Sequence, residues 1–214
     1  VFHVASLFDY FAPREALYTV NVEGTRHLMS ELAKQDSPRV IHWSTLGVLG
    51  DAGFDEPKTE ESAYHPENRY CESKVSQEQI VKSYDDRLHV SIVRPAPIYG
   101  PRHRYGVYNI VSLVERWGFV PVTKIYPRSK KRQFPCVHVD DIIGAAAFLA
   151  DHDEGIGETY NVLSDSVSQE DILHFIAAEM ELPTIDYPAP NRAFGLSGVP
   201  NVSSPSTRGP GSTQ

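Results

Sequence analysis

Tyr70 and Lys74 are the residues of this sequence whose types and spacing most directly suggest chemistry. They lie four positions apart in NRYCESKVSQEQIVKSY, which has the polar pattern of a helix start. On a helix, such residues share one face, one turn apart. An ammonium beside a phenol favours the phenolate, so Lys74 is expected to lower the pKa of Tyr70 toward neutrality and make it a general acid or base. The alternative is a solvated helix face with no chemistry.

A hydroxyl group upstream strengthens the chemical interpretation. The segment RVIHWSTLGVLGD places Ser44 and Thr45 directly after a short apolar run, followed by a turn that contains glycine. Downstream, HVSIVRPAPIYGP is a second apolar run that leads into a proline-stiffened loop. Ligands of parallel α/β sheets bind at the carboxyl ends of the strands, so both loops are expected to face a site.

The elements that must position these residues alternate along the chain. Apolar runs short enough for buried strands lie at residues 1–5, 40–42, 89–93 and 134–139. Segments with helical spacing lie at 17–33, 72–84, 108–117, 139–150 and 169–180, the last with Ser168 as the expected N-cap. This alternation predicts an α/β fold with a Rossmann-like, doubly wound parallel sheet and part of a small C-terminal substrate-binding region.

Three parts of the chain are distinguished. Residues 1–94 are expected to be the C-terminal part of a dinucleotide-binding Rossmann domain, and residues 95–185 a substrate-binding region mixed with the last Rossmann elements. Residues 186–214 are rich in Gly, Pro, Ser and Thr, which predicts a disordered tail. The chain starts inside an apolar run without a methionine, so we expect a fragment of a longer protein.

Composition limits the kind of partner. A net charge of −8 argues against nucleic acid, because phosphates require a basic face. No apolar run approaches the roughly 20 residues that span a bilayer. The two cysteines form no CxxC pair, and the adjacent Asp140 and Asp141 fit a helix start better than a metal site. The expectation is a cytoplasmic protein with a small-molecule substrate and no metal.

Seven segments in order carry a family resemblance: VFHVAS (1–6), NVEGT (21–25), WSTLGVLG (43–50), YCESK (70–74), VRPAPIYGP (93–101), CVHVDDI (136–142) and GETYNV (157–162). Together they resemble the extended short-chain dehydrogenase/reductases, also called the NAD-dependent epimerase/dehydratase family. The resemblance implies NAD or NADP as cofactor. It also implies a possible homodimer, because the helices matching 17–33 and 72–84 pair across a dimer in many relatives.

The resemblance also implies a role for each matching residue. Tyr70 would exchange a proton with the substrate oxygen during hydride transfer, Lys74 would lower its pKa and bind the nicotinamide ribose, Thr45 would hold the substrate oxygen, and Asn21 would support the site. The expected cofactor contacts are Ala5, Ser6, Ser44, Tyr70, Lys74, Pro95, Ala96 and Ile98.

Three departures from the family pattern bear on cofactor and substrate. The sequence contains no GxxGxxG loop, which in the family holds the dinucleotide. Relatives acting on nucleotide-sugars usually carry an arginine four residues before the histidine of V-H-V-D-D, and here that position is Phe134. Leu49 stands where a tyrosine is common, at the expected edge of the substrate pocket. Arg102 and Arg132 are further candidate substrate contacts.

Three functions remain open from the sequence. The leading one is an NAD(P)-dependent oxidoreductase acting on a secondary alcohol or ketone, as a reductase or in the manner of a 3β-hydroxysteroid dehydrogenase. The second is a nucleotide-sugar epimerase or dehydratase, and the third is a non-catalytic relative that binds NAD(P).

Overall fold

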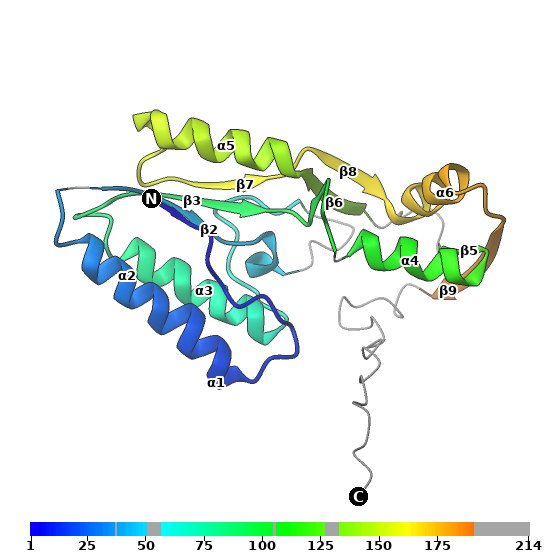
Figure 1. Cartoon of the computed structure of the whole chain (residues 1–214), viewed down its shortest axis with the longest axis horizontal. Helices are drawn as coiled ribbons and strands as arrows, with labels where there is room; N and C mark the ends of the chain where they lie inside the picture. Colours follow the sequence, from blue (N-terminus) through cyan, green and yellow to red (C-terminus); the bar gives the residue numbers. More distant parts are fainter. Residues whose placement is uncertain (37, 51–56, 105, 127–132, 191–214) are drawn as a thin grey trace, which may run out of the picture.

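The computed structural model describes residues 1–36, 38–50, 57–104, 106–126 and 133–190. Its central element is a four-stranded, fully parallel sheet with the strand order β1-β2-β3-β7. These strands are β1 (Phe2–His3), β2 (Arg39–Trp43), β3 (His89–Pro95) and β7 (Thr159–Val162). The α/β class and the parallel sheet predicted from the alternating pattern are confirmed (Figure 1).

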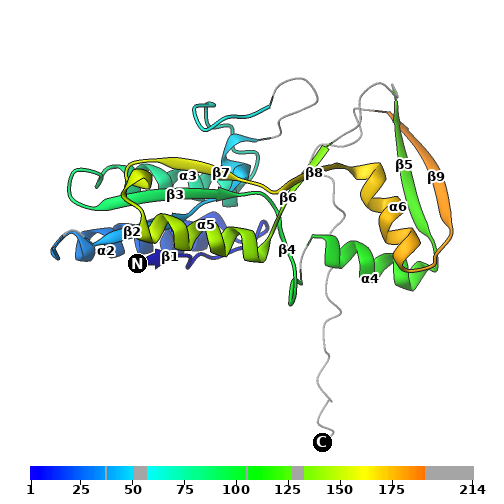
Figure 2. The same cartoon turned by 90° about the horizontal axis from the view of Figure 1, so that it is seen from above.

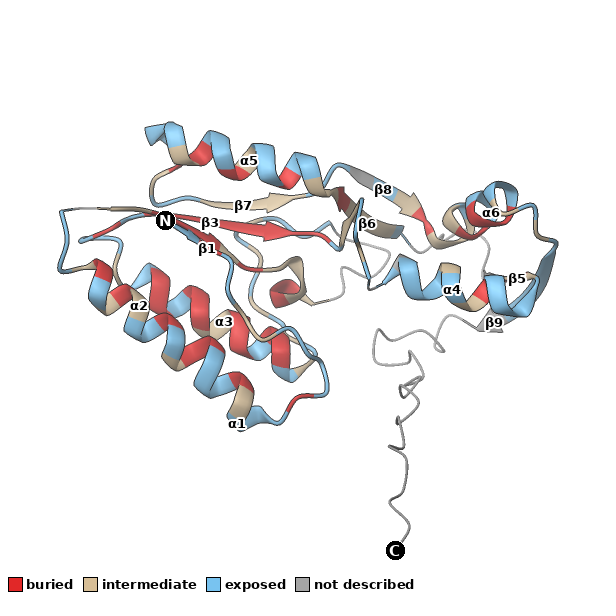
Figure 3. Cartoon of the chain, in the orientation of Figure 1, coloured by how far each residue is buried: buried red, intermediate tan, exposed pale blue. Residues whose placement is uncertain are grey.

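Helices cover both faces of this sheet. On one face lie α3 (Arg69–Lys82) and a helical rod made of α1 (Arg14–Leu17), a π-helical segment (Tyr18–Glu23) and α2 (Gly24–Leu32). On the other face lies α5 (Val139–Asp151), as the view in Figure 2 also shows. Because both faces are covered, β2 and β3 are buried along most of their length (Figure 3).

Side-chain alternation along the strands divides the core between these layers. On β2, Val40 packs with α2 and α3, whereas its neighbour Ile41 packs with α5. On β3, Ile92 packs with α2 and α3, and its neighbour Val93 packs with α5. Successive residues of a strand point to opposite faces, so a continuous apolar run is needed to supply two cores.

The second half of the chain builds a smaller part beside the sheet. Strands β4 (Ile98–Tyr99), β6 (Gln133–His138) and β8 (Asp165–Ser168) form one small sheet, in which β6 pairs parallel with β4 and antiparallel with β8. Helices α4 (Val107–Trp117) and α6 (Gln169–Glu179) pack with the parallel pair β5 (Val120–Tyr126) and β9 (Thr184–Pro190) around a separate apolar core. Figure 2 shows this part lying to one side of the main sheet.

Local sequence signals explain where two helices begin. Asn68 caps α3, since its Oδ1 accepts from Cys71 N at 2.9 Å, and Ser168 caps α6 through Asp171 N at 3.1 Å, as predicted. His138 precedes α5, whose first turn carries Asp140 and Asp141, so these carboxylates lie at the positive end of the helix dipole.

The predicted tail differs from the structure over its first residues. Residues 186–190 belong to β9, which pairs with β5 from Val120↔Thr184 to Tyr126↔Pro190. The prolines that suggested disorder are tolerated because β9 pairs with β5 alone among the described strands, and an edge strand needs fewer N–H donors. Residues 191–214 lie outside the described part. None of the described helices is long and apolar enough to cross a membrane.

Candidate active site

Tyr70 lies in the first turn of α3 and is only 7 % exposed. Aromatic rings from the segment after β1 cover it edge-on, with centroid distances of 5.0 Å to Phe8 and 5.6 Å to Tyr10. Burial raises the pKa of the Tyr70 phenol above its ordinary value, and neighbouring Tyr10 and Cys71 add to the rise. The buried phenol therefore stays protonated at neutral pH.

Lys74 lies one turn further along α3 and is 2 % exposed. Its Nζ donates to the carbonyl oxygen of Trp43 at 2.7 Å and lies 6.0 Å from the centroid of the Tyr70 ring. Burial lowers the pKa of Lys74 to about 8, and the negative charge of Glu78 opposes this shift. The predicted shared face is confirmed. The expected lowering of the Tyr70 pKa is wrong for this structure, because burial raises it and Tyr10 and Cys71 raise it further.

Thr45 follows β2 and opens a tight turn, Leu46–Leu49, by accepting from Gly47 N at 3.2 Å. This turn lies directly on α3. A Cβ atom added to Gly47 would come within 2.7 Å of the Cys71 sulfur, so a larger residue there would force the sulfur or the turn to shift. The close packing brings the turn that follows β2 against the first turn of α3, which contains Tyr70.

Asn21 is fully buried in the π-helical segment and fastens the loop after β1. Its Oδ1 accepts from Leu7 N at 2.6 Å, and its Nδ2 donates to Leu7 O at 3.1 Å and to Ser73 Oγ at 2.9 Å. Ser73 precedes Lys74, so Asn21 links the loop to α3. This geometry agrees with the supporting role expected for Asn21.

The predicted cofactor contacts lie at the carboxyl edge of the sheet. In the loop after β1, Ala5 is exposed, and Ser6 Oγ is buried with no hydrogen-bond partner among the described residues. At the end of β3, Pro95 and Ala96 are buried, and Ala96 N donates to Val162 O at 2.9 Å. Ile98, in β4, is half-buried.

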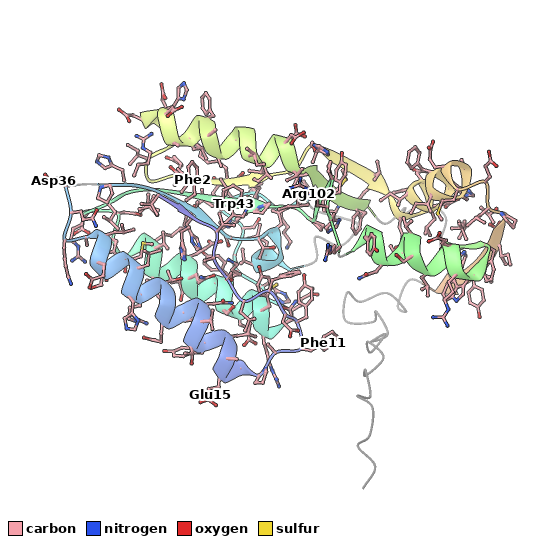
Figure 4. The ribbon with its side chains drawn as sticks, in the orientation of Figure 1. Phe2, Phe11, Glu15, Asp36, Trp43 and Arg102 are labelled. Carbon is pink, nitrogen blue, oxygen red and sulfur yellow. The ribbon has the colours of Figure 1, made fainter. Side chains whose placement is uncertain are left out.

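Other predicted residues are placed differently. Leu49 is 1 % exposed, so the expectation that it lies at a pocket edge is wrong: the turn that Thr45 opens directs it into the protein. Ser44 is buried, and its hydroxyl donates a hydrogen bond to the Glu78 carboxylate. Arg102 is exposed with a positive φ of 69°, in the loop between β4 and α4 (Figure 4). Phe134 is half-buried in β6, and Arg132 lies outside the described residues.

Several residues next to the site were missed by the sequence analysis. Phe8 and Tyr10 cover Tyr70, and Glu78 and Arg94 form a buried ion pair behind Lys74. Two signals could have found the ion pair: Glu78 lies four positions after Lys74 on the same helix face, and Arg94 is a lone charge within the apolar run VSIVRP. The aromatic residues give no such signal, because the loop has no regular period.

Comparisons with known proteins identify relatives of this chain. A sequence profile described as the NAD dependent epimerase/dehydratase family matches residues 1–162. An N-acetyl-alpha-D-glucosaminyl-diphospho-ditrans,octacis-undecaprenol 4-epimerase of Escherichia coli O157:H7 is 29 % identical over 53 % of this chain and 35 % of its own length. A 3beta-hydroxysteroid dehydrogenase/Delta(5)-Delta(4) isomerase 1 of Caenorhabditis elegans is 26 % identical over 76 % of this chain and 37 % of its own length.

A solved structure gives the same fold. It is a short-chain dehydrogenase/reductase superfamily protein from Agrobacterium tumefaciens with bound NAD, and it superimposes with a TM-score of 0.74 at 18 % identity, over 88 % of this chain and 67 % of its own. The chain thus spans 35–37 % of the length of the two curated relatives above.

Proposed function

The chain belongs to the NAD dependent epimerase/dehydratase family, and from this premise we propose an oxidoreductase that transfers hydride between a nicotinamide dinucleotide and a secondary alcohol or ketone. The observation that carries the proposal is the convergence of Tyr70, Lys74 and Thr45 where β2 ends against α3. Each of these side chains supplies a function that carbonyl reduction needs: a proton donor, a cation and a hydroxyl that orients the substrate oxygen.

The residues at this edge fit the nicotinamide end of a dinucleotide. Ser6 Oγ is a buried polar atom without a partner among the described residues, and a buried hydroxyl is normally hydrogen-bonded, so a bound ligand would satisfy it. Lys74 Nζ has three donor hydrogens, and Trp43 O takes one. When bound, NAD(P) supplies or accepts the hydride. The fit is argued for this end only, because the sequence contains no GxxGxxG loop.

Tyr70 acts as the proton donor in the reductive direction. Its hydroxyl would give a proton to the carbonyl oxygen as the carbonyl carbon gains hydride, so that the carbonyl becomes a neutral alcohol. Burial keeps the phenol in its protonated form, which is the form that donates a proton. Lys74, charged below about pH 8, stabilises the phenolate that proton donation leaves behind.

An apolar substrate is favoured by the surroundings of Tyr70. Phe8 and Tyr10 contact its ring and are themselves 45 % and 50 % exposed, so they present aromatic surface beside the phenol. Phe134 stands where relatives that act on nucleotide-sugars carry arginine. Both features support a ketone of sterol-like character. The second candidate, a nucleotide-sugar epimerase or dehydratase, is favoured by the likeness to the Escherichia coli epimerase.

Cofactor turnover separates these functions. For the oxidoreductase, absorbance of the reduced nicotinamide falls in step with product, whereas an epimerase or dehydratase restores its cofactor in each cycle and shows no net change. A protein that binds NAD(P) and forms no product in either assay would be the non-catalytic relative.

Replacing the phenol tests the mechanism. Tyr70→Phe in the whole protein is expected to lower kcat by roughly 100-fold or more, because the proton donor is lost. Cofactor affinity should remain nearly unchanged, as fluorescence titration would show. Tyr108→Phe, an exposed tyrosine on α4, is the control and should keep full activity. Unchanged turnover in Tyr70→Phe would overturn the mechanism.

A further inference from the structure

Glu78 and Arg94 form a charged pair that is almost completely shielded from solvent. Glu78 is 0 % and Arg94 1 % exposed. The Arg94 guanidinium donates two parallel hydrogen bonds to the Glu78 carboxylate, from Nε to Oε1 at 2.9 Å and from Nη2 to Oε2 at 2.8 Å. This fork-to-fork arrangement is the strongest geometry available to an ion pair. Removing two charges from water is nevertheless costly, so stability alone is a weak reason for such a pair.

The pair is the centre of a larger hydrogen-bond network. Glu78 also accepts from Tyr64 OH at 2.7 Å and from Ser44 Oγ. Arg94 Nη1 donates to Glu60 O at 3.2 Å, and Glu60 Oε1 accepts from the backbone N of Asn161 at 2.8 Å. The network therefore joins α3, β2, β3, β7 and the segment around residues 60–64.

The joined elements are the ones that carry the candidate site. Glu78 lies one turn after Lys74 on α3, Ser44 adjoins Thr45, and Arg94 precedes Pro95. Two hydrogen bonds join α3 to neighbouring residues at the end of β2: Lys74 Nζ donates to O of Trp43, the last residue of β2, and Oγ of the next residue, Ser44, donates to Glu78. Both bonds therefore fix the segment that leads into Thr45 against α3.

We propose that Glu78, held by Arg94, is a positioning residue for the reaction: it fixes Thr45 and Lys74 against Tyr70 and supplies the negative charge that faces the Lys74 ammonium. The proposal rests on the proposed function for its catalytic meaning. Its structural content is one buried carboxylate that binds the Arg94 guanidinium and the Ser44 hydroxyl, one helical turn from Lys74.

The charges around Lys74 determine the sign of the expected effect. Lys74 interacts with His3 of β1, His42 of β2 and Glu78 of α3, and the Tyr70 ring lies nearby on α3; Arg94 of β3 binds Glu78. Burial lowers the pKa of both histidines, so they are neutral at pH 7 and do not offset Glu78. Without the Glu78 charge, burial lowers the pKa of Lys74 below about 8, and the ammonium is lost at lower pH.

The first experiment measures the charge on Lys74 directly. In protein labelled with 13C at lysine Cε, the Lys74 signal is assigned with Lys74→Arg and titrated in the wild type and in Glu78→Gln. The pKa of Lys74 should fall by about one unit in Glu78→Gln. Glu72→Gln makes the same charge change on the exposed side of α3 and should leave it unchanged. An equal pKa in Glu78→Gln and the wild type would overturn the electrostatic part, whether or not the protein transfers hydride.

The second experiment separates positioning from folding. Glu78→Gln leaves Arg94 buried without its partner and is expected to be unstable. The double variant Glu78→Leu/Arg94→Met removes both charges and should regain thermal stability. Its kcat should stay roughly tenfold or more below the wild type, with the alkaline limb of the kcat/KM profile at lower pH. If the double variant keeps wild-type kcat and the alkaline limb of its kcat/KM profile does not move, the pair has a purely structural role and the proposal is overturned.

A third variant tests the positioning role if Glu78→Gln and Glu78→Leu/Arg94→Met both fail to fold. Ser44→Ala removes one bond to the carboxylate and leaves the ion pair intact. We expect kcat to fall several-fold with KM for the cofactor unchanged, because Thr45 loses its fastening to α3. Wild-type kcat in Ser44→Ala would overturn the positioning role. A wild-type protein without hydride transfer would instead overturn the proposed function and leave the Lys74 titration as the test of the pair.

Discussion

Burial outweighs charge pairing at Tyr70. The spacing of Tyr70 and Lys74 correctly predicts that they share a face, yet the pKa of the phenol is raised, because the aromatic rings of Phe8 and Tyr10 exclude water from it. A sequence shows the distance between charges along a helix, whereas desolvation depends on what the rest of the chain places over them. In this state Tyr70 carries its proton at neutral pH.

The pair His3 and His42 leads to a pH-dependent prediction. Their Nδ1 atoms lie 2.9 Å apart, in register between β1 and β2, and burial lowers the pKa of His3 to about 4 and that of His42 well below its usual value. In the unfolded chain both would titrate near 6.5, so the unfolded state binds more protons as pH falls from 6.5 toward 4. Stability is therefore present above pH 6.5 and is lost as the pH falls through this window.

Thermal unfolding at several pH values measures this loss. Between pH 7.5 and 5 the His3 shift alone is expected to remove about 2 kcal/mol of stability. The double variant His3→Leu/His42→Leu should show a flatter dependence over the same range. His27→Gln changes an exposed histidine on α2 and should follow the wild type. Parallel pH curves for the wild type and the double variant would contradict the prediction.

At the scale of elements, the contact between the Thr45 turn and α3 is the closest one in the site. Gly47 leaves no room for a Cβ because the Cys71 sulfur would lie at 2.7 Å. Gly47→Ala is therefore expected to shift the turn and to lower kcat several-fold. Cys71→Ala removes the sulfur, so the double variant Gly47→Ala/Cys71→Ala should recover most of the activity.

Gly24→Ala is the matched control for this cycle. Gly24 begins α2 with open space around its Cβ position, so alanine there should leave activity unchanged and stabilise the helix by up to about 1 kcal/mol. Equal activity losses in Gly47→Ala with and without Cys71→Ala would show that the steric explanation is wrong.

At the scale of the whole molecule, the outer face of the helical rod leaves apolar side chains uncovered. Tyr18 and Val20, in the π-helical segment, are 51 % and 52 % exposed, and Figure 3 shows exposed residues along this side of the rod. We propose that the rod pairs with a second copy of the protein, because it leaves the apolar side chains of Tyr18 and Val20 more than half exposed.

Charge placed on this face tests the pairing. Tyr18→Glu/Val20→Glu is expected to convert a dimer into a monomer in light scattering coupled to gel filtration, because buried unpaired carboxylates are costly. Ile143→Glu/Phe148→Glu makes the same change on the exposed side of α5, beyond the opposite face of the sheet, and should leave the dimer intact. A monomeric wild type, or dissociation only by the α5 variant, would contradict the proposal.

The sequence by itself determined the alternation of strands and helices, the parallel sheet, the capping of α6 by Ser168 and the sharing of one helix face by Tyr70 and Lys74. These follow from periodicity and short-range geometry. Only the tertiary structure decided which residues surround Tyr70, that Leu49 points into the core, that residues 186–190 form a strand, and that Glu78 binds Arg94 behind Lys74. The reason is physical: desolvation and hydrogen-bond pairing depend on contacts between segments that lie far apart along the chain, and a local pattern can suggest a buried charge without identifying its partner.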